Sequence, residues 1–175
     1  MRKLITGLAV VACFFAFCKS NTGSSATGSD STAAALKRNK QTALNAEMAL
    51  SKGDVNGLLK DCTANFADLG DGSTKPMNSK DSIKAAFKEF FTAFPDFTGK
   101  NFFAVADSNT VIVTGEWSGT FKGAYGTTKP NGKSFKIPEA DIFTFDNAGK
   151  ITLHRSVQSE ATTLYQLGLL VPVKK

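Results

Sequence analysis

The stretch "SFKIPEADIFTFDNAGKITLHRSV", residues 134–157, decides the fold that this sequence predicts. Its centre, "DNAG" at 146–149, consists of residues that favour tight turns. The flanking segments are rich in β-branched and aromatic residues, so we expect strands at 134–145 and 150–159. Because the turn is short, these strands are predicted to be antiparallel neighbours.

The register of this strand pair follows from matching the apolar faces of its two strands. Two apolar pairs align, Phe145 with Ile151 and Phe143 with Leu153. The same register places Asp141 opposite Arg155, with Cβ atoms about 5 Å apart. Strict alternation turns His154, the only histidine, to the outer, polar face. The sequence therefore predicts an ion pair between Asp141 and Arg155 on the inner face, with His154 in solvent.

The residues that precede this pair predict three helices. A first helix is expected at 32–52, and a short second helix at 55–62 begins with Asp54 as its N-cap. Ser79 is predicted to cap a third helix, which Pro95 ends. Apolar residues recur at helical spacing in the first and third helices: Leu36, Ala43, Leu44 and Met48, then Ile83, Phe87, Phe90 and Phe94.

Further strands are expected at 64–70, 98–106 and 110–121, and a last short helix at 161–170. The 175 residues suffice for one domain with its own core. Helices first and consecutive antiparallel strands afterwards predict an α+β fold.

The inner face of the sheet predicts a pocket with one polar end. Trp117 shares the parity of the apolar residues in its strand, while Glu139 and Asp141 share the parity of the phenylalanines in theirs. Fifteen phenylalanines form either a very apolar core or an apolar pocket wall. Two interpretations stay open: the ion pair of Asp141 and Arg155 is purely structural, or it forms the polar end of a small-ligand site.

The N-terminal end has the layout of a bacterial export signal. Met1, Arg2 and Lys3 are followed by an apolar run at 4–17, too short for a comfortable membrane span, and then by Cys18. We expect lipid attachment at Cys18, with ordinary cleavage, an uncleaved anchor, or use of Cys13 as alternatives. The predicted divisions are 1–18 (signal peptide), 19–31 (flexible linker), 32–172 (folded domain) and 173–175 (basic tail). The expected location is the bacterial cell envelope, as a membrane-anchored lipoprotein.

Charge and cysteine content exclude several classes of function. The net charge is +6, with lysines scattered singly, so no nucleic-acid binding is expected. After export only Cys62 remains in the domain, so no internal disulfide forms, and one cysteine with one histidine cannot build a structural zinc site. A nucleophilic pair of Cys62 and His154 would require the two side chains to meet. No metal and no cofactor are expected.

Four motifs resemble the SnoaL-like polyketide and ester cyclases, within the superfamily named after nuclear transport factor 2. They are "SKGDVNGLLKDCTANF" at 51–66, "FFTAFPDFTG" at 90–99, "YGTTKPNGKSFKIPEADIFTFDNAGKI" at 125–151 and "LYQLGLL" at 164–170. The resemblance covers residues 39–172. It implies a cone-shaped, curved antiparallel sheet wrapped around N-terminal helices.

The resemblance also implies an acid/base aspartate near the end of the last strand, where this sequence has Ser159. Two functions follow as hypotheses. The first is binding of a small hydrophobic molecule with a polar or anionic group, through Arg155, Trp117, Glu139 and Ser159. The second is an enzyme of cyclase, isomerase or hydrolase type that uses Asp141 or Glu160 as the acid/base. The family also makes a homodimer a candidate assembly.

Overall fold

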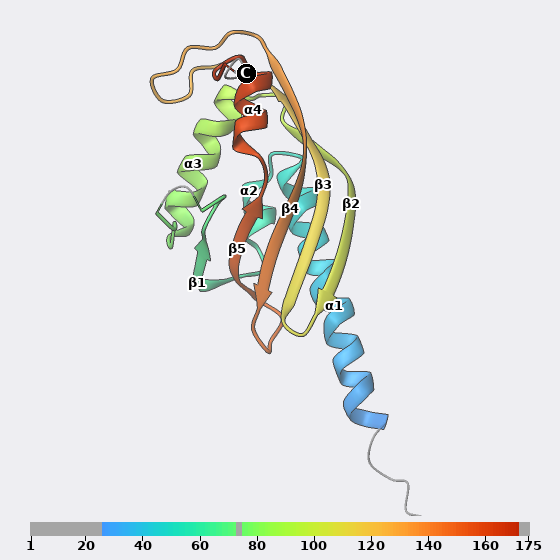
Figure 1. Cartoon of the computed structure of the whole chain (residues 1–175). Coiled ribbons are helices and arrows are strands. Elements are labelled where there is room, and N and C mark those ends of the chain that lie inside the picture. The colour runs from blue at the N-terminus through green and yellow to red at the C-terminus, as the bar shows by residue number, and fades with distance from the viewer. Residues whose placement is uncertain (1–25, 73–74, 172–175) are drawn as a thin grey trace, which may run out of the picture.

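The fold is a curved, unclosed sheet with helices packed on one side of it (Figure 1). The computed structural model describes residues 26–72 and 75–171. The predicted signal peptide, with Cys13 and Cys18, and the predicted basic tail at 173–175 lie outside the described residues. No helix of the described part is both long enough and apolar enough to cross a membrane.

Four helices and five strands follow one another in the part of the chain that the structure describes. The helices are α1 (Ala26–Leu50), α2 (Val55–Leu59), α3 (Lys80–Ala93) and α4 (Glu160–Gln166). The strands are β1 (Cys62–Asp68), β2 (Thr98–Asp107), β3 (Thr110–Thr120), β4 (Ser134–Phe145) and β5 (Ile151–Val157). This order confirms the predicted α+β fold.

The helix caps follow local side-chain chemistry. Asp54 accepts a hydrogen bond from the backbone N–H of Gly57 at 2.8 Å, and Ser79 accepts one from the N–H of Ser82 at 3.5 Å, so both predicted caps are confirmed. Helix α1 begins at Ala26, before the start predicted at residue 32. The residues between these positions carry no apolar periodicity, which is why the sequence pattern missed them.

The strands lie in the order β1-β5-β4-β3-β2. Strands β2 to β5 are antiparallel neighbours, as predicted. Strand β1 pairs with β5 in parallel, and the long connection that a parallel pair needs is supplied by helix α3 and strands β2 to β4. Helix α1 packs against β2 and β3 on the inner side of the sheet.

A β-bulge in β5 makes the predicted register wrong. Phe145 does lie opposite Ile151, but the next pair is Thr144 with Leu153, so Thr152 is an extra residue in β5. Beyond the bulge the alternation of faces is reversed. A one-residue slip moves every following side chain to the opposite face of the sheet.

The bulge exchanges the predicted places of His154 and Arg155. His154 lies opposite Phe143 and points inward, and Asp141 lies opposite Ser156. Arg155 lies opposite Ile142 and is exposed on the outer face. The predicted ion pair of Asp141 with Arg155 and the predicted solvent exposure of His154 are therefore both wrong.

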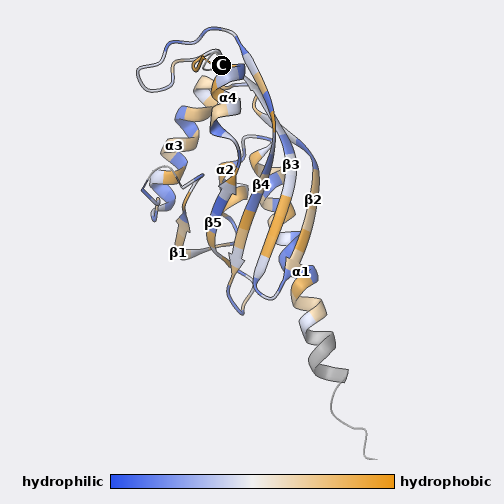
Figure 2. Cartoon of the chain, viewed as in Figure 1, coloured by the Kyte–Doolittle hydropathy of each residue, from blue (hydrophilic) through white to orange (hydrophobic). Residues whose placement is uncertain are grey.

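Two clusters of buried side chains form the core between the helices and the sheet. The first surrounds Phe143, Val113 and Ile83, where α1 and α3 meet the sheet. The second contains Trp117 and Phe94 and includes Leu167, which follows α4. Figure 2 shows the hydrophobic stretches of β2 and β3 that contribute to this interior. Buried side chains therefore cover most of the inner face of the sheet.

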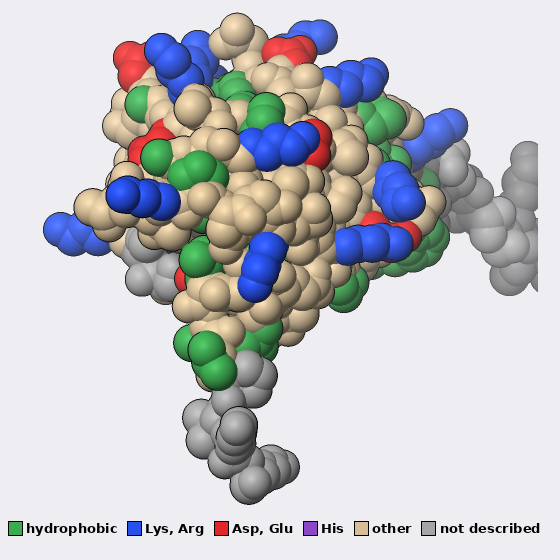
Figure 3. Space-filling model, turned by 90° about the horizontal axis from the view of Figure 1, so that it is seen from above, with side chains coloured by type: hydrophobic (Ala, Val, Ile, Leu, Met, Phe, Trp, Pro, Cys, Tyr) green, Lys and Arg blue, Asp and Glu red, His purple; other side chains and the backbone are tan. Residues whose placement is uncertain are grey.

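The basic side chains are dispersed over the surface. Figure 3 shows lysine and arginine side chains standing apart on the upper face, with acidic side chains between them. Several lysines pair with acids, at Nζ–O distances of 3.0 Å for Lys122 with Asp96 and 2.7 Å for Lys150 with Asp61. Such exposed pairs contribute little to stability, on the order of 0 to 1 kcal/mol each.

Candidate functional site

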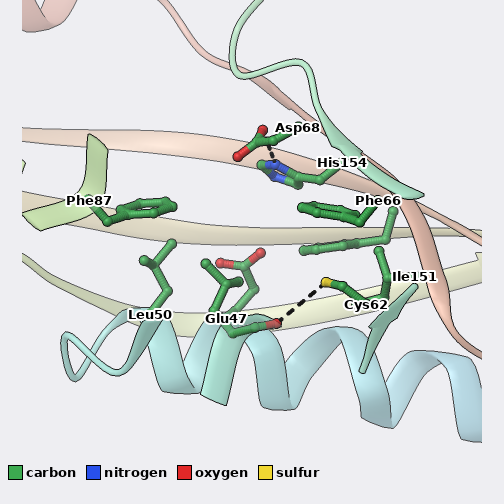
Figure 4. A pocket seen from close by; sticks show the side chains of 10 residues that line it. Glu47, Leu50, Cys62, Phe66, Asp68, Phe87, Ile151 and His154 are labelled. Carbon is green, nitrogen blue, oxygen red and sulfur yellow. Dashed lines mark hydrogen bonds and ion pairs between the residues drawn. The ribbon is translucent and has the colours of Figure 1, made fainter. Parts of the chain in front are cut away.

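His154 lies between two aspartates inside the fold. Its Nδ1 is 3.0 Å from Oδ1 of Asp68 on β1, and its Nε2 is 3.1 Å from Oδ1 of Asp141 on β4. The imidazole packs against the ring of Phe143, with centroids 5.0 Å apart, and its side chain is only 18% exposed. Figure 4 shows the contact with Asp68 at the upper end of a pocket. The imidazole can donate a hydrogen bond to both carboxylates only if each of its ring nitrogens carries a proton.

The two aspartates keep the imidazole charged. Burial by itself disfavours the cation, but hydrogen bonds and charges from Asp141 and Asp68 outweigh it and raise the pKa of His154 to about 10. Burial likewise opposes ionisation of Asp68. The hydrogen bond and charge of His154, with the N–H of Gly70 donating at 2.9 Å, nevertheless lower the pKa of Asp68. The site therefore holds an imidazolium clamped between carboxylates.

Glu47, on α1, faces this clamp from the opposite wall (Figure 4). The residue is 1% exposed, and its Oε2 has no hydrogen-bond partner. One carboxylate oxygen of Glu47 lies within 4.8 Å of the facing atoms of Asp141 and His154. Burial raises the pKa of Glu47 well above its usual range, and the charge of Asp141 raises it further. Both effects favour the neutral, protonated form of the Glu47 carboxyl group.

A fourth carboxyl group, Glu139, extends the cluster along β4. Glu139 and Asp141 share one face of the strand, as predicted, and Glu139 is half-buried. Burial, followed by the charge of Asp141, raises the pKa of Glu139 to about 7, although a hydrogen bond from Ser156 opposes the shift.

The cluster borders an enclosed cavity of about 20 Å³. Glu47, Asp68 and His154 contribute the polar part of its lining. The apolar part comes from Leu50, Leu58, Cys62, Phe66, Phe87, Phe143 and Ile151. A cavity of this size holds about one water molecule. The predicted phenylalanine-rich interior is thus mostly core, with a small cavity at its polar end.

Cys62 and His154 both line this cavity, but they do not form a nucleophilic pair. The Cys62 thiol donates to the carbonyl of Leu58, with a sulfur–oxygen distance of 3.8 Å. Burial raises its pKa to about 12, so it remains a thiol.

The remaining residues of the predicted site lie elsewhere. Trp117 belongs to the second core cluster, where it stacks on Phe97 with centroids 4.8 Å apart. Ser159 is the N-cap of α4 and accepts from the N–H of Thr162 at 3.3 Å, while Glu160 is exposed in the first turn of that helix. Together with the outward-facing Arg155, these residues do not join Asp141 and Glu139.

The sequence reasoning missed Glu47, Asp68 and His154. The sequence does contain a signal for Glu47, which is its helical spacing from three other residues: Asn39, Ala43 and Ala46. The structure shows that all four residues are buried on the same helix. Met48, predicted to lie on the apolar stripe of this helix, is 39% exposed instead. Asp68 carries no such signal, because its contact with His154 depends on the parallel pairing of β1 with β5.

Several solved structures resemble this fold. A phenazine biosynthesis-related protein from Pseudomonas aeruginosa has a TM-score of 0.70 and 18% identity, covering 85% of this chain and 96% of its own. A candidate polyketide cyclase from Xanthomonas campestris pv. campestris has a TM-score of 0.68 and 14% identity, covering 76% and 98%. A protein with a ketosteroid isomerase-like fold from Catenulispora acidiphila has a TM-score of 0.61 and 17% identity, covering 75% and 98%.

These identities establish the fold alone, and among curated proteins none matches significantly. The family is established by sequence, because residues 19–167 match the family described as SnoaL-like polyketide cyclase. The match spans the helices, the sheet and all four carboxyl groups around His154. This chain therefore belongs to the SnoaL-like polyketide cyclase family.

Proposed function

We propose that this protein binds a small, largely apolar molecule in the cavity that Glu47, Asp68 and His154 line. The observation that carries the proposal is the carboxyl group of Glu47, which lines the cavity and whose buried Oε2 has no hydrogen-bond partner. Burying such a polar atom costs about 1 to 3 kcal/mol, which a hydrogen-bonding ligand would recover.

The charge of the cluster selects the polar group of the ligand. The expected anchor for an anion, Arg155, is exposed on the outer face and does not reach the cavity. Asp68 and Asp141 already surround the one imidazolium. An anionic ligand would be repelled, so the polar group is a hydroxyl, a carbonyl or an amine.

Entry of a ligand requires the cavity to widen. At about 20 Å³ it has room for one water, whereas ligand pockets typically measure about 300 to 1,000 Å³. The half-buried side chains of Leu50, Leu58 and Phe87 line the cavity, and changes in their rotamers would enlarge it. These side chains belong to α1, α2 and α3, so a ligand would enter between the helices and the sheet.

Native mass spectrometry of the purified full chain, kept in EDTA, tests this proposal. We expect either a retained small molecule or a rise in melting temperature with apolar alcohols, ketones or amines. Leu58→Trp fills the cavity and should abolish both effects, whereas Leu170→Trp, at a position 38% exposed, should change neither. Absence of both signals in the wild type, or their survival in Leu58→Trp, would contradict the proposal. The same spectra report whether the chain is a homodimer.

A second candidate function is acid/base catalysis of cyclase, isomerase or hydrolase type. It is favoured by one observation: carboxyl oxygens of Glu47 and Asp141 and a ring nitrogen of His154 lie within 4.8 Å of one another, and Glu47 and His154 line the cavity. Turnover of a ketone or ester substrate should be lost in Asp141→Asn and Glu47→Gln. Glu160→Gln is the control, since Glu160 is exposed on α4. Unchanged turnover in the first two variants would exclude this function.

We also propose that the chain is exported and lipid-anchored through Cys18. The support is the basic start, the apolar run at 4–17 and the polar segment that follows Cys18. Metabolic labelling with a fatty acid should modify the wild type and Cys13→Ser, but not Cys18→Ser. Labelling that survives in Cys18→Ser, or an unlabelled wild type, would contradict the proposal.

A further inference from the structure

The cluster around His154 contains more acidic than basic side chains. Four carboxyl groups surround it, those of Glu47, Asp68, Glu139 and Asp141. Over residues 26–72 and 75–171, His154 is the only basic side chain that forms an ion pair with any of them. Buried carboxylates in proteins are normally paired with a cation or coordinate a metal ion.

Three of these residues converge on a single point. Glu47 from α1, Asp141 from β4 and His154 from β5 each offer one ligand atom, and these atoms lie within 4.8 Å of one another. Ligands of one zinc ion bind at roughly 2.0 to 2.2 Å, so they lie about 3 to 4 Å apart. Small side-chain rotations therefore bring all three atoms to bonding distance of one ion.

The unpartnered oxygen of Glu47 is an independent indication of a missing ligand. Oε2 is buried and has no hydrogen-bond donor, and its carboxyl group points toward His154 in Figure 4. Glu47 is 1% exposed, so bulk water does not donate a hydrogen bond to this oxygen. A cation between Glu47 and Asp141 would satisfy this oxygen and remove the repulsion between the two carboxylates.

Asp68 completes the arrangement from behind His154. Its Oδ1 lies 3.0 Å from Nδ1 of the imidazole, which directs Nε2 toward Asp141 and Glu47. Metal-bound histidines usually donate their second nitrogen to a carboxylate in this way. The N–H of Gly70 in turn donates to Asp68 at 2.9 Å and fixes its orientation.

We propose that Glu47, Asp141 and His154 form a binding site for one Zn²⁺ ion, with Asp68 as the positioning residue. One imidazole nitrogen and two carboxylate oxygens suit zinc, whereas Ca²⁺ and Mg²⁺ require six or more oxygen ligands. The neighbouring cavity of about 20 Å³ supplies the fourth position, for a water molecule. Zinc replaces the proton on Nε2 of His154 and any proton held by Glu47, and each displaced proton leaves to solvent.

The expectation of no metal, drawn from the sequence, rested on counting only cysteine and histidine as ligands. This inference does not depend on the proposed function, because zinc could bind whether or not an organic ligand does. Titration with the metal alone therefore tests it separately from the retention of a small molecule.

The experiment titrates the metal-free full chain with Zn²⁺ by calorimetry and measures bound zinc after desalting. We expect one tightly bound ion per chain and a higher melting temperature. Co²⁺ in the same site should give d–d absorption without a sulfur-to-cobalt charge-transfer band. No zinc binding, or a charge-transfer band that indicates a cysteine ligand, would overturn the proposal.

Isosteric variants locate the ion. Glu47→Gln and Asp141→Asn should lose zinc, and Asp68→Asn should bind it roughly 10- to 100-fold more weakly. Glu116→Gln is the matched control, because Glu116 pairs with Lys136 on the surface at 2.6 Å and lies outside the site. Full zinc binding by folded Glu47→Gln, or equal loss in Glu116→Gln, would refute the assignment. The cobalt spectrum of the wild type decides the ligand type even if Asp141→Asn does not fold.

Discussion

His154→Gln and Arg155→Gln are neighbouring substitutions that should destabilise the metal-free protein to very different extents. His154 fills the space between Asp68 and Asp141, whereas Arg155 is exposed on the outer face of β5. Strict alternation from the sequence predicts the reverse assignment. Comparing the two stabilities thus tests the bulge at Thr152 directly.

The magnitude follows from the histidine's protonation. Its pKa is about 10 in the folded protein, against an ordinary value of 6.5. Each pKa unit corresponds to about 1.4 kcal/mol, so at pH 7 the charged imidazole contributes about 4 kcal/mol to the free energy of unfolding. Breaking a buried ion pair by removing one partner typically costs about 3 to 5 kcal/mol, which agrees. Arg155→Gln should cost at most about 0.5 kcal/mol, as at most surface positions.

Urea denaturation of the full chain in EDTA, followed by the fluorescence of Trp117, measures both values. Trp117 is the only tryptophan and is 2% exposed, so its emission reports unfolding of the core. A cost below about 1 kcal/mol for His154→Gln, or a larger cost for Arg155→Gln than for His154→Gln, would refute the register and the charge assignment.

Three further predictions concern the same metal-free protein. Because the folded pKa of His154 is raised to about 10, its contribution is complete below pH 6.5 and is lost as pH rises through 10, so urea midpoints should fall over this interval in the wild type but not in His154→Gln. Glu47→Met should raise the free energy of unfolding by about 1 to 3 kcal/mol by removing an unpartnered buried carboxyl group, and a loss of stability would contradict this. Gly123→Ala places a Cβ in steric clash with the backbone oxygen of Thr92 and should lower the free energy of unfolding by roughly 3 kcal/mol or more. In Gly119→Ala the nearest atom to the new Cβ is a Phe135 side-chain carbon at 3.2 Å, so the fall in melting temperature should be smaller than in Gly123→Ala.

Much of the fold was predictable because its signals are local. Asp54 and Ser79 cap their helices with their own side chains, and the turn at 146–149 joins β4 to β5. The apolar alternation of β4 placed Asp141 and Glu139 on the inner face correctly. Each of these features depends on residues within a few positions of one another, so the sequence contains the whole signal.

The other half of the site depends on contacts between distant segments. Asp68 reaches His154 only because β1 pairs with β5, and Glu47 reaches it only because α1 crosses the sheet. A periodicity argument treats each strand or helix separately and cannot show which carboxyl groups will meet. In the sequence, Glu47 resembles any solvent-exposed helix glutamate, and only the packing of α1 against the sheet shows that it is buried.

The sequence by itself determined the elements, the α+β class, the family and the inward direction of Asp141. The tertiary structure decided that His154 points inward and Arg155 outward, because one extra residue at Thr152 reverses the faces of β5. A bulge leaves no mark in the composition or hydropathy of a strand, so the sequence pattern alternates without interruption through Thr152. In the folded sheet, the side chains after the bulge nevertheless point to the opposite face from the one that the pattern predicts. Because of that inversion, Asp141 pairs with His154 and not with the expected Arg155. The histidine is thereby buried among carboxyl groups.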